Sequence, residues 1–117
     1  HGDIVKMYNE RGAVLGAAYV TERVIPGAVM QDHGARTDEI ISGELDRGGN
    51  HNMICPDSQA SKYCTAMATN NFLVEIAKVD PAEMDEWRRK YPEVFTRDYD
   101  PGAGLTFESW VIQGDGK

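Results

Sequence analysis

Cysteine is scarce in this sequence, and its two thiols stand alone. Cys55 and Cys64 lie nine positions apart, with no C-x-x-C pair and no second cluster of cysteine and histidine at the spacing of metal ligands. The sequence therefore favours neither a zinc site nor a disulfide scaffold, and we expect both cysteines to be free thiols. The three histidines, His1, His33 and His51, are far apart and lie in no H-E-x-x-H frame, so they do not favour a metal site either.

Basic side chains and long apolar runs are also in short supply. The sequence has 12 lysines and arginines against 19 aspartates and glutamates, a formal net charge of -7. This balance argues against a nucleic-acid backbone or an anionic membrane as partner. An anionic small molecule is still a candidate ligand, because backbone N–H groups and neutral side-chain amides can bind an anion without added positive charge. No apolar run approaches about 18 residues, so we expect no membrane insertion.

The chain opens on His1-Gly2-Asp3 and runs directly into a strand-like segment, without an initiator methionine. We interpret it as a piece of a longer protein with one hydrophobic core. A targeting segment would then lie outside it, so the sequence leaves the compartment open.

The first third of the sequence predicts strands with short connections. Residues 4–8 and 13–20 are apolar runs joined by Asn9-Glu10-Arg11-Gly12, which predicts a hairpin. The Pro26-Gly27 turn precedes a third predicted strand at residues 28–32. Residues 37–41 could form one helical turn with Thr37 as N-cap, and residues 42–52 have so little apolar content that they predict a loop.

The second half predicts one clear strand and one clear helix. Residues 61–68 have weak helical spacing and predict a short helix or an irregular segment, whereas residues 72–79 predict a strand. Asp80-Pro81 supplies an N-cap and a first-turn proline for a helix that ends near Lys90, before Tyr91-Pro92. An extended segment is expected at residues 105–112.

These elements predict a mainly β protein with short helices. We expect a core domain at residues 1–80 and a helical and extended tail at residues 81–117. The tail is expected to pack on the core through its large aromatic residues, which are Trp87, Tyr91, Phe95 and Trp110.

The candidate ligand-binding stretch is residues 48–62, where glycines, side-chain amides and hydroxyls concentrate. The alternative is an ordinary turn, because these residue types are also the common turn formers. His33 shares a corner with Gly34 and Arg36 that could face a ligand, and its alternative is an exposed loop residue. His51 and Cys55 would lie about 13 Å apart on one strand face, which disfavours a cysteine nucleophile. We find no self-contained catalytic set and no phosphate-binding P-loop.

Taken in order, several of these pieces resemble the C-terminal molybdopterin-dinucleotide-binding domain of the dimethyl sulfoxide reductase family. The family pattern has a DGD-V-V strand, an N-x-R-G turn, a PG-V turn and an HGA-W corner, matched here from Gly2, Asn9, Pro26 and His33. Residues 50–61 resemble its N-x-L-T-x-D-x-x-x-S segment, and residues 72–79 its closing strand. The resemblance covers residues 2–79, and the tail matches nothing that we can assign.

The resemblance implies a six-stranded double-psi β-barrel that holds part of a bis(molybdopterin guanine dinucleotide) carrying molybdenum or tungsten. Asn52 and Asp57 match positions that hydrogen-bond the pterin or guanine end of the cofactor. Ser61 matches a position that contacts a phosphate or the pterin. The corner at His33 matches a segment that lies along the pterin. The candidate contacts are therefore His33, Gly34, Ala35, Arg36, Asn50, Asn52, Asp57 and Ser61. Arg36 stands where many members have an aromatic residue and Cys55 where threonine is common, which suggests a less common branch such as that of pyrogallol hydroxytransferase or acetylene hydratase.

The same resemblance implies partners. They are the remaining domains of a parent catalytic subunit and an iron–sulfur electron-transfer subunit, and the metal ligand would lie outside this chain, which alone should be inactive. The alternative from a different class is a stand-alone β-barrel binding or scaffold module without redox activity. A stand-alone enzyme ranks third, because no triad, dyad or metal set is present.

Overall fold

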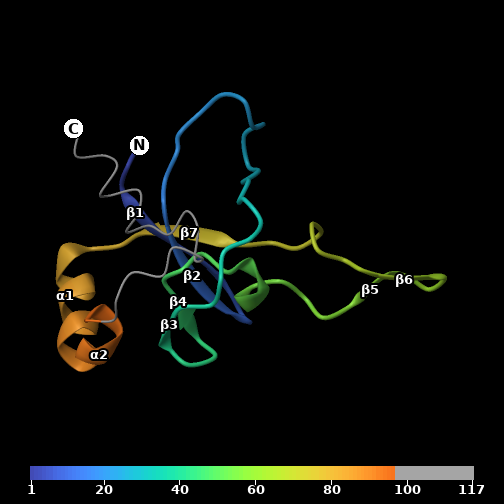
Figure 1. Ribbon diagram of the computed structural model, residues 1–117. Helices are drawn as coiled ribbons and strands as arrows, with labels where there is room; N and C mark the ends of the chain where they lie inside the picture. Colours follow the sequence, from blue (N-terminus) through green and yellow to red (C-terminus); the bar gives the residue numbers. More distant parts are fainter. Residues whose placement is uncertain (97–117) are drawn as a thin grey trace.

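The chain is seen in a computed structural model that describes residues 1–96. Its first element is the predicted hairpin, which is confirmed: β1 (Ile4–Asn9) pairs antiparallel with β2 (Gly12–Ala17) (Figure 1). The turn is tighter than expected, because Asn9 itself pairs with Gly12 and its Oδ1 accepts the N–H of Arg11 at 2.9 Å. The predicted extended segment at residues 105–112 and Trp110 lie outside the described residues.

The hairpin forms the middle of a five-stranded sheet. The strand order is β3-β4-β2-β1-β7, with β3 at Glu39–Ile41, β4 at Leu45–Asp46 and β7 at Glu75–Lys78. β4 runs parallel to β2, whereas the other pairs are antiparallel. A short 3-10 helix, η1 (His51–Met53), packs on β2 so closely that a Cβ at Gly12 would lie 2.7 Å from the carbonyl oxygen of Met53.

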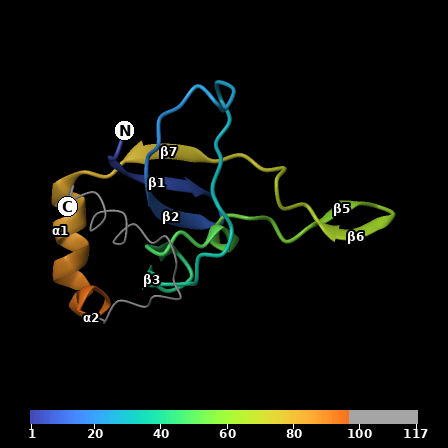
Figure 2. The same cartoon turned by 45° about the horizontal axis from the view of Figure 1, so that its top comes forward.

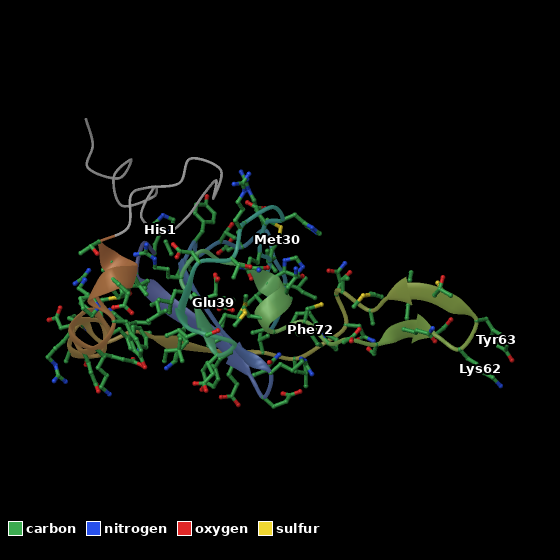
Figure 3. The ribbon with its side chains drawn as sticks, turned by 60° about the horizontal axis from the view of Figure 1, so that its bottom comes forward. His1, Met30, Glu39, Lys62, Tyr63 and Phe72 are labelled. Carbon is green, nitrogen blue, oxygen red and sulfur yellow. The ribbon has the colours of Figure 1, made fainter. Side chains whose placement is uncertain are left out.

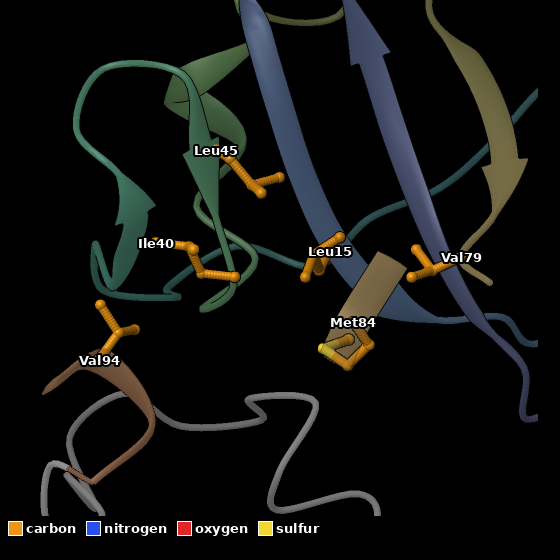
Figure 4. Close-up of a cluster of buried hydrophobic side chains, with 6 residues drawn as sticks. All are labelled: Leu15, Ile40, Leu45, Val79, Met84 and Val94. Carbon is orange, nitrogen blue, oxygen red and sulfur yellow. The ribbon is translucent and has the colours of Figure 1, made fainter. Parts of the chain in front are cut away.

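Two helices cover one part of this sheet. α1 (Pro81–Lys90) begins as predicted, because the side chain of Asp80 accepts the N–H of Ala82 at 2.9 Å, and α2 (Pro92–Phe95) follows at once. The helices close the core, which consists of Leu15, Ile40, Leu45, Val79, Met84 and Val94 (Figure 4). The aromatic side chains of Trp87, Tyr91 and Phe95 are partly buried against this core.

Three predicted elements are wrong. Residues 28–32 form no strand and belong to the long connection between β2 and β3. Residues 39–41 form β3 and no helical turn, since the β-branched pair Ile40-Ile41 is drawn into pairing with β4. Residues 42–52 are not all loop, because they contain β4 and the start of η1.

The segment at residues 61–68 is also not helical. It contributes to a separate hairpin of β5 (Gln59–Ser61) and β6 (Cys64–Met67), which projects away from the sheet as an arm (Figures 1 and 2). Its side chains are exposed on both strands, and the turn at Lys62 and Tyr63 forms the tip (Figure 3). The weak helical spacing of this segment was overridden by local antiparallel pairing.

A mainly β fold with two short α-helices is therefore confirmed, but the described residues do not form a closed six-stranded barrel. They form an open sheet in which β3 and β7 are the outer strands, plus the two-stranded arm. Cys55 and Cys64 are free thiols, as expected. None of the helices in residues 1–96 is both long enough and apolar enough to cross a membrane.

Candidate functional site

The structure brings the predicted corner together with the first part of the candidate ligand-binding stretch. We call residues 33–37 the corner and residues 48–52 the central loop. The rings of His33 and His51 meet edge to face, with their centroids 5.3 Å apart. The side-chain nitrogen of Asn50 donates to the hydroxyl of Thr37 at 2.5 Å. A Cβ at Gly48 would lie 2.5 Å from the carbonyl oxygen of Arg36, so only glycine allows this approach of the two backbones.

Asp46 lies beneath the central loop and has no exposed surface. Its Oδ2 accepts the N–H of Asp38 at 2.6 Å and its Oδ1 accepts the N–H of Asn50 at 3.1 Å. The backbone groups of Gly48 and Gly49 also hydrogen-bond this carboxylate. Burial raises the pKa of Asp46 above its ordinary value, and the backbone donors act in the opposite direction.

The two asparagines of the loop have different environments. The Oδ1 of Asn50 accepts the N–H of Asn52 at 3.1 Å and caps η1, while its Nδ2 reaches Thr37, so both polar atoms hold the loop in place. The side chain of Asn52 is exposed and makes no hydrogen bond to another residue within 1–96. Asn52 is therefore available to a ligand, and Asn50 is part of the support.

Gln31 forms the back of the site. Its Nε2 donates to the carbonyl oxygen of Gly49 at 2.5 Å, while its Oε1 is buried and has no hydrogen-bond partner within the described part of the chain. Gly49 has a φ of +82°, in the left-handed region that favours glycine. The sequence reasoning missed both Gln31 and Asp46. Asp46 had a usable signal, because an aspartate two residues before a glycine pair commonly bonds the backbone that follows it.

Asp57 and Ser61 are not brought to the corner. Asp57 is exposed on the way into the arm, and Ser61 ends β5, next to the tip formed by Lys62 and Tyr63 (Figure 3). The exit from the central loop is fixed from the other side, since Asn9 Nδ2 and Arg11 Nε both donate to the carbonyl oxygen of Ile54 at 2.8 Å.

The exposed side of the site offers mainly neutral and cationic groups. Arg36, His33 and Asn52 are exposed there, and His51 is half-buried beside them. Such groups suit a ligand with heterocyclic edges and negative charge, because amides pair with ring edges and guanidinium with phosphate or carboxylate. Among residues 1–96, no group of three histidine, cysteine, aspartate or glutamate side chains could hold a metal ion.

Comparison with known proteins agrees on one family. The family model described as "Molydopterin dinucleotide binding domain" matches residues 1–73. The large subunit of pyrogallol hydroxytransferase from Pelobacter acidigallici is 41% identical over 83 residues, which is 68% of this chain and 10% of that protein. Trimethylamine-N-oxide reductase 1 of Escherichia coli K12 is 37% identical over 81 residues, 67% of this chain and 10% of that protein. The chain thus spans 10% of the length of each of these relatives.

Proposed function

Because this chain belongs to the molydopterin dinucleotide binding domain family, we propose that its corner and central loop together hold one end of a molybdopterin guanine dinucleotide. The observation that carries the proposal is the meeting of these two segments inside the matched residues 1–73. His33, Arg36 and Asn52 contact the cofactor, with Gly34 and Ala35 lying along it, while Asn50 holds the loop against the corner.

The donor set fits such a group. The amide of Asn52 can pair with the edge of a guanine or pterin ring, and the Arg36 guanidinium can bind a phosphate or a carboxylate of the substrate. Asp57 and Ser61 are proposed to contact a more distant part of the same dinucleotide. When bound, the molybdenum or tungsten carried by the pterin supplies the redox or atom-transfer chemistry, whereas this chain binds and orients the dinucleotide.

We further propose that the chain works as the cofactor-binding domain of a larger catalytic subunit, which an iron–sulfur subunit serves as electron-transfer partner. The exposed apolar side chains of the arm support this proposal. Tyr63 at the tip is 90% exposed, and Leu73, which follows the arm in the sequence, is 89% exposed. A two-stranded hairpin is marginally stable alone, so contact with further domains would stabilise it. The double-psi β-barrel is proposed for that complete assembly, where the outer strands β3 and β7 could gain partners. The division into a core at residues 1–80 and a tail stays part of this proposal.

The test is a titration of the isotopically labelled 117-residue chain with GMP, followed by amide chemical shifts. We expect perturbations at the corner and between Asn50 and Ser61. Asn52→Ala should weaken binding without changing Tm, because its side chain supports nothing else among the described residues. Asn70→Ala, at an exposed position beyond the arm, is the matched control and should leave binding unchanged. No perturbation at millimolar GMP would contradict the proposal and favour a binding or scaffold module.

A further inference from the structure

The buried carboxylate of Asp46 reverses the expected role of the central loop backbone. Glycine-rich loops commonly bind anions by pointing their N–H groups outward at the ligand. Here the N–H of Asn50 and the backbone groups of Gly48 and Gly49 are directed inward, to Asp46. These backbone donors are therefore used within the protein, and the side chains of the loop must provide the contacts to a ligand.

The same carboxylate connects the loop to the strand beside the corner. Its second oxygen accepts the N–H of Asp38, whose own carboxylate pairs with the buried Arg47 at 2.8 Å. Asp38 follows Thr37, which in turn accepts the hydrogen bond from Asn50. Asp46 thus holds both segments of the site from below, and its two oxygens fix their relative position.

We propose that Asp46 is a positioning residue, whose carboxylate holds the central loop against the corner so that Asn52 faces the cofactor. This inference rests on the proposed function above. Asp46 touches no ligand itself, because it has no exposed surface. It acts through Asn50, whose backbone N–H it accepts and whose side chain caps the turn that carries His51 and Asn52.

Asp46→Asn is the direct test, because it keeps the shape of the side chain and replaces one acceptor oxygen with a donor that faces backbone N–H groups. We expect GMP to bind the full chain about tenfold more weakly or worse, which corresponds to the loss of one hydrogen bond to a charged group. The matched control is Val94→Ala, which lowers Tm through the core on the side of α2. It should leave the dissociation constant for GMP within about twofold, because distant sites act independently.

Two outcomes separate this inference from the function on which it rests. If the wild-type chain binds GMP and Asp46→Asn binds it equally well, Asp46 has no positioning role and only this inference fails. If the wild-type chain does not bind GMP, the proposed function fails and the inference falls with it.

A second measurement needs no variant and therefore does not depend on whether Asp46→Asn folds. In the wild-type chain without ligand, the amide protons of Gly48, Gly49 and Asn50 should exchange slowly with solvent, because they bond a buried carboxylate. Rapid exchange of these three protons would overturn the inference.

Discussion

Replacing Gly48 with alanine should separate the two halves of the site. A Cβ at this position would lie 2.5 Å from the carbonyl oxygen of Arg36, 3.2 Å from the Cβ of Asp38 and 3.3 Å from Oδ1 of Asp46. The first distance is roughly 1 Å short of an ordinary van der Waals contact. The obstacle is backbone, so no side-chain rotation relieves it, and the loop or the corner must move.

The expected change in the free energy of unfolding of Gly48→Ala is the sum of two opposing effects. Forcing an extra carbon into a packed site costs about 1–3 kcal/mol. The lower conformational freedom of alanine in the unfolded chain returns about 0.4–1 kcal/mol. Gly48 does not have a positive φ, so no further backbone strain enters. We therefore expect a net loss of about 1–2 kcal/mol in the free energy of unfolding.

The assay is urea unfolding of the full chain followed by circular dichroism, with Gly16→Ala as the matched control. Gly16 lies in β2, where a Cβ would have nothing within 4 Å and the φ is not positive. Gly16→Ala should therefore be as stable as the wild type or slightly more stable. GMP binding should weaken in Gly48→Ala alone. If the two variants unfold at the same urea concentration and bind GMP alike, the close approach of the corner and the loop is refuted.

Three further predictions follow from contacts elsewhere in the sheet. Gly12→Ala should destabilise the fold by about 1–3 kcal/mol in urea unfolding, because its Cβ would meet the Met53 carbonyl at 2.7 Å; stability equal to wild type would contradict this packing of η1. The hydrogen bond to Glu75 raises the pKa of Tyr8 above its ordinary value, so its stabilising effect is present below about pH 10 and is lost as pH rises through the folded pKa. Ultraviolet difference titration against Tyr8→Phe should show this late ionisation, and Glu75→Ala, which removes both the acceptor and the charge, should abolish the delay. A chain that ends at residue 80 loses core residues such as Met84, so it should melt without a cooperative transition, whereas the full 117-residue chain should melt cooperatively.

The parts of the fold that the sequence predicted are those with local causes. The β1–β2 hairpin depends on two apolar runs and a turn, and α1 depends on Asp80 and Pro81, which cap and begin it. The parts that failed depend on pairing over long sequence distances. β4 is two residues long and pairs in parallel with β2, which no local pattern indicates. The division at residue 80 stays a prediction, although Met84, from beyond that point, lies in the core.

The candidate site divides in the same way. The corner and the central loop were identified from the order of their motifs, and their meeting in space could not be read from composition or periodicity. The sequence did not predict that Asp46 supports the central loop, because the burial of Asp46 depends on the pairing of β4 with β2 in the sheet. The assignments of Asn52, Arg36 and the other candidate residues to the cofactor stay predictions until a ligand is tested.

The inward direction of the loop donors changes which part of a dinucleotide the loop can recognise. A phosphate needs several donors that converge on it, and the backbone groups of Gly48, Gly49 and Asn50 already hydrogen-bond Asp46. What the loop still offers is the amide of Asn52, which has both a donor and an acceptor and therefore matches the edge of a heterocycle better than a phosphate. We therefore expect a phosphate contact at this site to come from the corner, where Arg36 is exposed. In the proposed complex the loop would recognise the ring of the dinucleotide and the corner its negative charge, although the net charge of the protein is -7.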